Sequence, residues 1–199
     1  CSLLLINAIN MSDGINGLSA ILQISIFIFL IYFNYNNEIL TNKNLIFSKY
    51  FVLFSYFYIM TLFIFLIFNL LNKVFLGDGG SFLLSFILIN SLLLNYKNLD
   101  FFYPENILML LWLPGLDMLR LFIIRVKNKT NPFRPDQNHF HHILRKLFKK
   151  NVNCLIYYFS LFIISNVLVI NYPQHSLLTL IGISIIYFIT IYIAKKKYV

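Results

Sequence analysis

The stretch YFVLFSYFYIMTLFIFLIFNLL, residues 50–71, sets the class of fold because it contains no charged side chain. A helix that crosses the hydrocarbon core of a bilayer needs roughly 17–25 predominantly apolar residues. Inside a bilayer every backbone N–H and C=O group must be paired within the protein, and a continuous apolar run achieves this as an α-helix. Residues 50–71 therefore predict a transmembrane helix.

Five further runs of the same kind lie on either side of this stretch, at residues 18–35, 81–96, 107–124, 152–170 and 177–194. The whole chain of 199 residues is 59% hydrophobic and 12% charged, which leaves too little polar surface to cover a soluble fold. No run shows the strict alternation of a barrel strand. We predict an all-α, polytopic transmembrane helical bundle with about six transmembrane helices, forming a single membrane domain over residues 1–199.

The distribution of basic residues predicts how this bundle is oriented. Six crossings place segments 72–80, 125–151 and 195–199 on the same side as the residues before 18, and that side carries twelve Lys and Arg residues: Lys73, Arg125, Lys127, Lys129, Arg134, Arg145, Lys146, Lys149, Lys150, Lys195, Lys196 and Lys197. The other side carries three, Lys43, Lys49 and Lys97. The positive-inside rule makes the first side cytoplasmic. The net charge of +9 has two explanations that stay open, topology alone or attraction of anionic lipid or a phosphorylated substrate to the loop at 125–151.

Three polar segments interrupt the apolar chain, and all three fall on the predicted cytoplasmic side. The first polar segment, NAINMSDGING, covers residues 7–17 and spaces Asn7, Asn10 and Asp13 three residues apart, on one face of a helix. Oxygen ligands of this kind suit Mg²⁺, and the glycines allow close approach of a ligand or of another backbone. The alternative is a plain helix end with an Asp-Gly turn. Polar groups near lipid are costly and tend to be kept for function. Because all three segments fall on the same side, we expect them to form one site.

The second polar segment, GDGGS at residues 77–81, places Asp78 in a glycine-rich turn before a helix. Backbone amides at a helix N-terminus form a ready anion site, whereas an Asp at this position can also be an ordinary N-cap. The third polar segment, PFRPDQNHFHH at residues 132–142, gathers three of the four histidines beside Arg134. The spacing does not suit zinc on a helix, which prefers ligands at i and i+4. Histidines beside an arginine instead favour a role as hydrogen-bond donors to phosphate or diphosphate oxygens, and the alternative is a polar loop with incidental histidines.

Taken in order, NAINMSDGINGL, FLGDGGS and HFHH resemble the signatures of the polyprenyl-phosphate N-acetylhexosamine-1-phosphate transferases, glycosyltransferase family 4, and Pro114-Gly-Leu-Asp117 before the basic loop fits the same pattern. The resemblance covers about residues 7–145 by motif and the last two helices by topology. The His-x-His-His form looks more like the N-acetylglucosamine branch than the muramoyl-pentapeptide branch.

The resemblance implies an enzyme that transfers N-acetylhexosamine-1-phosphate, with N-acetylglucosamine as the default sugar, from a UDP-sugar to undecaprenyl or another polyprenyl phosphate and releases UMP. This reaction initiates the synthesis of cell-envelope glycans such as lipopolysaccharide. The enzyme is expected to be a multi-pass protein of the inner (plasma) membrane with a cytoplasmic active site, to form a homodimer and to bind no nucleic acid. Mg²⁺ is the expected cofactor, with Mn²⁺ as an alternative.

The resemblance also implies roles for individual residues. Asp78 is the expected principal metal ligand, assisted by Asn10. Asp13, Asp78 and His139 are the expected catalytic residues, and Phe75 is expected to stack on uracil. The remaining expected substrate-binding residues are Asn7, Asn16, Arg134, His141 and His142.

Two departures from the family pattern bear on activity. Asn16 stands where many members have a second Asp, which removes one negative charge but is not expected to inactivate the site. The chain begins at Cys1 without an initiator Met, and it has no paired aspartates like those that the family uses for the lipid acceptor. We therefore expect it to be a C-terminal portion that is inactive alone.

Two alternatives remain open at this stage. One is a truncated, non-catalytic relative that binds polyprenyl phosphate or a partner protein, which the absence of an upstream aspartate pair would favour. The other is a transporter, which expects polar groups at mid-depth on several helices, whereas Asp117 is the only acid inside an apolar run.

Overall fold

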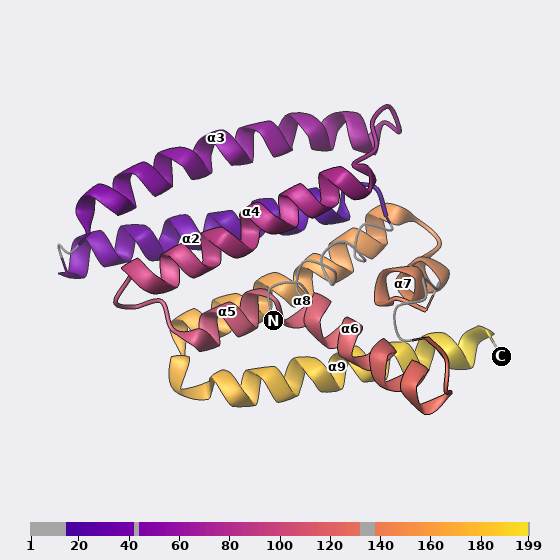
Figure 1. The fold of residues 1–199 in the computed structure, drawn as a ribbon. Coiled ribbons are helices and arrows are strands. Elements are labelled where there is room, and N and C mark those ends of the chain that lie inside the picture. Colours follow the sequence, from indigo (N-terminus) through magenta and orange to yellow (C-terminus); the bar gives the residue numbers. More distant parts are fainter. Residues whose placement is uncertain (1–14, 42–43, 132–137, 199) are drawn as a thin grey trace. The chain divides into compact units, whose positions relative to one another are not determined.

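The fold is described from a computed structural model that defines residues 15–41, 44–131 and 138–198 (Figure 1). Within these ranges the regular structure is entirely helical, which confirms the predicted all-α class. Five helices are long and apolar enough to cross a membrane, or up to six if one bent pair forms a single span. The chain is therefore a multi-pass membrane protein. It divides into two compact units, residues 1–107 and 108–199, and each is described by itself; the single domain expected from the sequence stays a prediction.

Unit 1 consists of three long helices, which are followed by the short helix α5 (Pro104–Leu110) at the boundary between the two units. They are α2 (Leu18–Thr41), α3 (Leu45–Leu70) and α4 (Gly77–Asn98), and α2 packs against both of the others. The predicted runs at 18–35, 50–71 and 81–96 lie within or overlap these helices. Helix α4 starts inside the second polar segment, so Gly77 to Ser81 form its first turn rather than a loop before it.

Polar pairs as well as apolar side chains hold unit 1 together. The Asn34 side-chain amide donates to Asn95 Oδ1 at 2.6 Å, and the hydroxyl of Tyr58 donates to Gln23. The Phe27 ring packs on the Tyr58 ring with centroids 4.4 Å apart. Because buried polar groups are costly unless they are paired, these amides fix how α2 packs against α3 and α4.

Unit 2 contains helices α6 (Trp112–Lys127), α7 (Phe140–Phe148), α8 (Asn151–Asn171) and α9 (Ser176–Tyr198), with the 3₁₀ turn η1 (Pro173–His175) between the last two. Helices α7, α8 and α9 pack against one another. Helix α7 lies inside the segment at 125–151 that the sequence predicts as a basic loop. Its buried face carries Phe140, Ile143 and Leu144, while Arg145 is exposed. The loop therefore contains a short amphipathic helix.

The predicted helix at 107–124 is broken. Helix α5 ends at Leu110, α6 begins at Trp112, and the two are bent by 71°. Pro114 explains the break, because its ring would clash with the carbonyl of the residue four positions earlier, Leu110, if one helix ran through. The sequence prediction treated residues 107–124 as one continuous helix and did not foresee the bend, for which Pro114 was the available signal.

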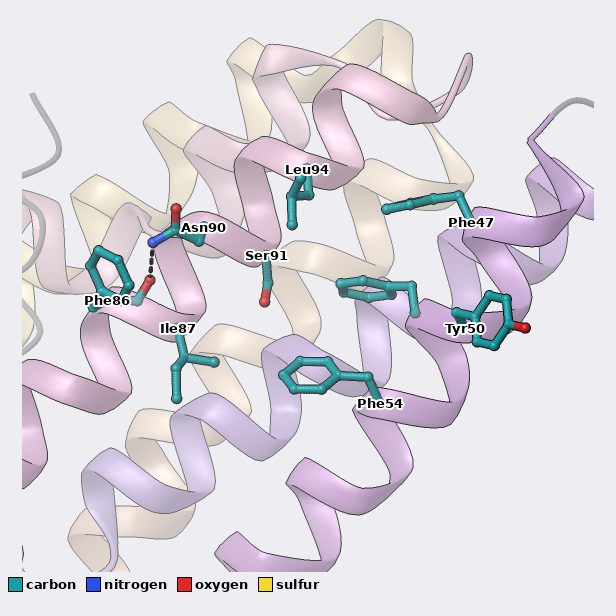
Figure 2. Close-up of a pocket in the computed structure, with 9 residues that line it drawn as sticks. Phe47, Tyr50, Phe54, Phe86, Ile87, Asn90, Ser91 and Leu94 are labelled. Atoms are coloured by element: carbon teal, nitrogen blue, oxygen red, sulfur yellow. Dashed lines mark hydrogen bonds between the residues drawn. The ribbon is translucent and has the colours of Figure 1, made fainter.

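Large apolar side chains cover the outward faces of the spans. On α3, Phe57, Met60 and Phe63 are 64%, 63% and 56% exposed. A groove of about 540 Å³ between α3 and α4 opens on this apolar surface and is lined mainly by aromatic rings, with no charged side chain (Figure 2). An exposed apolar surface of this extent is expected where lipid rather than water is the solvent.

Candidate functional site

In unit 1 the first polar segment is bonded to the end of α3. The side chain of Asn69, which is buried, accepts a hydrogen bond from the Gly17 backbone N–H at 2.6 Å and donates to the Val74 carbonyl at 2.8 Å. The Asn16 amide donates to Asn72 Oδ1 at 2.7 Å. One asparagine near the end of an apolar helix thus ties the end of the first polar segment to the turn that leads into the second.

Backbone conformation shapes this junction. Gly17 has φ +89°, a left-handed conformation that strains a residue with a Cβ, and a Cβ there would lie 2.9 Å from Leu70 Cδ2, so that side chain would have to shift. Asn72 also takes a left-handed conformation, φ 57°, and the Lys73 N–H bonds back to the Phe68 carbonyl to close the end of α3. The α3 atoms nearest to Gly17 are side-chain atoms of Leu66 and Leu70, and the close approach of a ligand or of another backbone expected at the glycines stays a prediction.

Asp78 and Phe75 lie just beyond this junction. Asp78 is exposed in the first turn of α4, where a carboxylate interacts favourably with the positive end of the helix dipole. It is not the N-cap, which is Leu76. Phe75 is 75% exposed, and a Cβ added at Gly79 would meet no atom within 4 Å. The turn therefore presents one carboxylate, one aromatic ring and open space beside them.

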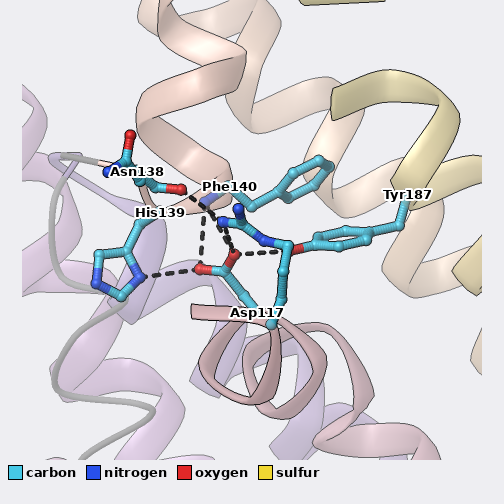
Figure 3. A network of polar contacts seen from close by, with 6 residues as sticks. Asp117, Asn138, His139, Phe140 and Tyr187 are labelled. Atoms are coloured by element: carbon cyan, nitrogen blue, oxygen red, sulfur yellow. Dashed lines mark hydrogen bonds and ion pairs between the residues drawn. The ribbon is translucent and has the colours of Figure 1, made fainter. Parts of the chain in front are cut away.

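In unit 2 the centre of the polar network is the buried carboxylate of Asp117 on α6 (Figure 3). Its Oδ1 accepts hydrogen bonds from Tyr187 Oη at 2.7 Å and from an Arg120 Nη at 2.8 Å, and the Phe140 backbone N–H donates to both oxygens at 3.1 and 3.2 Å. Its Oδ2 lies 2.9 Å from His139 Nδ1. One carboxylate thus joins α6, α9 and the N-terminus of α7.

Asp117 and Arg120 also bond to the backbone at the start of α7, at Asn138 and Phe140. The backbone N–H groups at a helix N-terminus have no partner within the helix, and Asp117 supplies one for Phe140 from another helix. Arg120 donates to the Asn138 carbonyl and, through Nε, to Tyr187 Oη at 2.7 Å. A buried ion pair satisfied on this many sides is rigid, and breaking it leaves an uncompensated charge.

The three histidines of the third polar segment form one cluster at this helix N-terminus. The rings of His139 and His141 stack with centroids 5.6 Å apart, and those of His141 and His142 lie 4.2 Å apart. Burial, with smaller effects from His142 and His139, lowers the pKa of His141 to about 3. Burial and the charges of His139, Arg145 and Lys146 also lower the pKa of His142. His141 is therefore neutral at physiological pH, and among the described residues its Nε2 has no hydrogen-bond partner.

The predicted site residues are thus only partly placed. Asn7, Asn10, Asp13 and Arg134 lie outside the described residues. Asn16, Phe75 and Asp78 belong to the junction of unit 1, and His139, His141 and His142 to the network of unit 2. Their assigned roles stay predictions.

Two residues that the sequence did not single out hold these groups in place. Asn69 could have been suspected as a lone amide near the end of an apolar helix. Nothing in the sequence distinguishes Tyr187 among the 13 tyrosines.

The donor set of the described residues fits a weakly chelated hard cation but not a structural metal centre. No group of three or more His, Cys, Asp or Glu side chains that could hold a metal occurs among residues 15–41, 44–131 and 138–198. Mg²⁺ is usually held by one or two carboxylates together with substrate phosphates; Asp78 is an exposed carboxylate, and its role as a metal ligand stays a prediction.

The fold and these polar groups define a multi-pass helical membrane protein with a carboxylate at one helix start and a histidine cluster at another. Residues 1–95 match the family model of glycosyl transferase family 4, which confirms the predicted resemblance to this family. No solved structure matches significantly.

Several curated relatives share the name undecaprenyl-phosphate alpha-N-acetylglucosaminyl 1-phosphate transferase. The protein from Thermotoga maritima is 31% identical over 159 residues, 79% of this chain and 45% of that protein. The protein from Haemophilus influenzae is 40% identical over 75 residues, 36% of this chain and 21% of its own length, and that from Escherichia coli K12 is 34% identical over 77 residues, 37% and 20%. The matched part thus spans between a fifth and a half of the relatives.

Proposed function

We propose that the protein transfers N-acetylglucosamine-1-phosphate from UDP-N-acetylglucosamine to undecaprenyl phosphate and releases UMP, as the first step in the assembly of a cell-envelope glycan. The names of the relatives support this reaction. The structural observation that carries the proposal is the Asn69 junction, which bonds the end of the first polar segment to the turn before Asp78. Two of the three segments that the family shares are thereby joined within one unit.

In the proposed reaction one phosphoanhydride replaces another. An oxygen of the lipid phosphate forms a bond to the sugar-side phosphorus of the UDP-sugar. The bond from that phosphorus to the bridging oxygen breaks, and this oxygen leaves with UMP. Because bonds of the same kind are made and broken, the reaction is expected to be close to thermoneutral and reversible.

The residues of this chain bind and orient the reacting phosphates. Asp78, assisted by Asn10, would hold Mg²⁺ or Mn²⁺, and the metal supplies charge neutralisation for the two phosphate groups when it is bound. Asp13 and Asn16 would position nucleotide or metal, and Phe75 would stack on uracil. Arg134, His141 and His142 would hold phosphate oxygens, and His139 would act as the catalytic histidine.

The same proposal covers location and assembly. The basic residues at the ends of α6, α7 and α9 support an inner (plasma) membrane protein with its site on the cytoplasmic side. We include a homodimer formed through membrane helices, which native mass spectrometry of the purified protein would test.

An exchange assay on the full-length protein in membranes tests the reaction. Radiolabelled UMP is supplied with UDP-N-acetylglucosamine, undecaprenyl phosphate and MgCl₂. Because the reaction is reversible, label is expected to appear in UDP-N-acetylglucosamine only when the lipid is present. Asp78→Asn is expected to lower the exchange rate roughly 100-fold or more, the scale of losing a group that stabilises charge in the transition state.

Glu105→Gln is the matched control, because it neutralises another exposed acid in the first turn of a helix, outside the proposed site. Its exchange rate is expected to stay within twofold of wild type (about 0.4 kcal/mol). Absence of exchange with any UDP-N-acetylhexosamine, in a folded full-length protein, would reject the proposal in favour of a non-catalytic relative.

A further inference from the structure

The buried carboxylate of Asp117 makes a specific arrangement with His139 that the proposed reaction does not by itself require. His139 is the N-cap residue of α7, and its Nδ1 faces Asp117 Oδ2 at 2.9 Å (Figure 3). Figure 3 shows His139 and Tyr187 approaching the carboxylate from opposite sides. The direction of every hydrogen bond in this network can be worked out from donor chemistry alone.

Tyr187 fixes the first direction. Its hydroxyl accepts from Arg120 Nε at 2.7 Å, because a guanidinium can only donate, so its single proton is free to point to Asp117 Oδ1. The Phe140 N–H and an Arg120 Nη are also donors. An ionised carboxylate accepts only, so the remaining contact requires that His139 Nδ1 carries a proton.

A neutral imidazole carries one proton, and if that proton sits on Nδ1, then Nε2 is left as the ring atom with a free lone pair. A carboxylate that accepts a hydrogen bond from one ring nitrogen fixes both the tautomer and the orientation of a functional histidine. The capping contact at Phe140 adds to this by fixing the backbone next to the ring.

We propose that Asp117 is a positioning residue for His139: it holds the ring as the Nδ1–H tautomer and leaves the Nε2 lone pair free to accept a proton or a hydrogen bond from the substrate. This inference rests on the proposed function for its catalytic consequence but not for the tautomer itself. Asp117 touches no reacting atom and acts only through His139. Arg120 and Tyr187 keep the carboxylate ionised and in place.

The substitution Asp117→Asn tests this inference sharply because the network dictates how the new amide sits. Tyr187 and Arg120 both donate to the Oδ1 position, so the amide oxygen stays there. The amide NH₂ then replaces Oδ2 and faces His139 Nδ1. Nδ1 must become an acceptor, and the ring proton moves to Nε2.

The primary measurement is ¹⁵N NMR of ring-labelled histidine in the full-length protein, with His139 identified from the signals that His139→Gln removes. Spectra are recorded at a pH where the ring has lost its second proton. The proton is expected on Nδ1 in the wild type and on Nε2 in Asp117→Asn. A wild-type ring protonated on Nε2, or an unchanged tautomer in the variant, would overturn the proposal.

Kinetics of UMP exchange give the second measurement. Asp117→Asn is expected to lower the rate roughly 10–100-fold, the usual effect of losing a group that orients a functional histidine. In a His139→Ala background the same change is expected to lower the rate no further. An equal additional loss in that background would show that Asp117 has a purely structural role.

Tyr187→Phe is the matched control because it removes one donor to Asp117 Oδ1 and leaves the contact between Oδ2 and His139. It is expected to lower thermal stability while the proton stays on Nδ1. If the wild type shows no exchange at all, the proposed function fails, but the NMR measurement still decides the relation between Asp117 and His139.

Discussion

At the scale of single residues, Asn69 is the side chain that connects the end of the first polar segment to the turn before α4. It is a buried amide in a helix whose other residues are nearly all apolar, and both ends of its side chain bond to backbone outside that helix. A buried donor left without a partner costs its full desolvation free energy, whereas losing an exposed hydrogen bond costs little. The junction should therefore be more sensitive to Asn69 than to any other amide of α3 or α4.

Asn69→Leu is expected to lower the free energy of unfolding by roughly 1–3 kcal/mol, because the Gly17 N–H loses its acceptor. Thermal melting of the purified protein in detergent measures the change. Asn90→Leu is the control: the Asn90 amide is exposed and bonds only to the Phe86 carbonyl of its own helix, and its replacement should change stability by about 0.5 kcal/mol or less. Equal effects of the two substitutions would mean that the Asn69 hydrogen bonds stabilise the fold no more than those of an exposed amide.

The histidine cluster predicts an acid sensitivity with a definite sign. The pKa of His141 is about 3 in the folded protein and 6.5 without the fold, so between these values the unfolded chain binds a proton that the folded protein does not. Stability should therefore fall as the pH drops from 6.5 toward 3, by up to about 1.4 kcal/mol per pH unit from this residue.

His141→Gln is expected to reduce the difference between melting temperatures measured at pH 7 and pH 5. His175→Gln, at an exposed histidine in η1, serves as the control and should leave that difference as it is in the wild type. A pH dependence identical in wild type and His141→Gln would show that the burial of His141 has no energetic consequence.

At the scale of elements, alanine substitutions at Gly17 and Gly182 distinguish a tightly packed glycine with a left-handed backbone from a glycine in an ordinary, uncrowded helix. Gly17→Ala is expected to destabilise unit 1 by about 1–2 kcal/mol, because a left-handed backbone is strained by a Cβ and the new atom would lie 2.9 Å from Leu70 Cδ2. Gly182→Ala in α9 meets nothing within 4 Å and should stabilise by roughly 0.5–1 kcal/mol through helix propensity. Melting temperatures that move in opposite directions for the two variants confirm the packing, and a parallel shift contradicts it.

The limits of the helices show what a hydropathy pattern can and cannot predict. The apolar runs predicted the existence of α2, α3, α4, α8 and α9, because apolar length is what the bilayer requires. The predicted end at residue 35 was too early, since Asn37 lies on α2 beyond it, is buried and accepts from the Asp100 N–H at 3.0 Å. Polarity alone does not separate an asparagine that ends a span from one that pairs across helices.

At the scale of the whole molecule, the sequence predicted which segments carry the acids and histidines. It did not predict which residues elsewhere in the chain bond to those segments. Acids and histidines stand out in an apolar chain because they are expensive near lipid. Asp117 stood out in this way, yet its partner Tyr187 lies 70 residues further along the chain and carries no such signal. A contact of that separation depends on how α6 and α9 pack, which only the three-dimensional structure shows.

The proposed use of UDP-N-acetylglucosamine depends on how the protein is oriented in the membrane, because this substrate must reach the site from the cytoplasm. Helix α8 has 21 residues, about 31 Å at 1.5 Å per residue, which matches the hydrocarbon core of about 30 Å. Lys150 and His175, at its two ends, should therefore lie on opposite sides of the membrane. Basic residues follow α6 and α7 and end α9 on the Lys150 side, so this side should be cytoplasmic.

Single cysteines at these two positions test the orientation, with Cys1 and Cys154 replaced by Ser. In intact cells a membrane-impermeant maleimide is expected to label His175→Cys and to label Lys150→Cys only after permeabilisation. Inside-out vesicles should reverse the pattern, which controls for a site that is merely unreactive. The opposite result in cells would put Lys150 on the outer face. The histidine cluster would lie there too, because it is at the start of α7, which directly precedes Lys150 and α8. A nucleotide-sugar donor made in the cytoplasm could not then reach it, and the proposed reaction would lose its substrate.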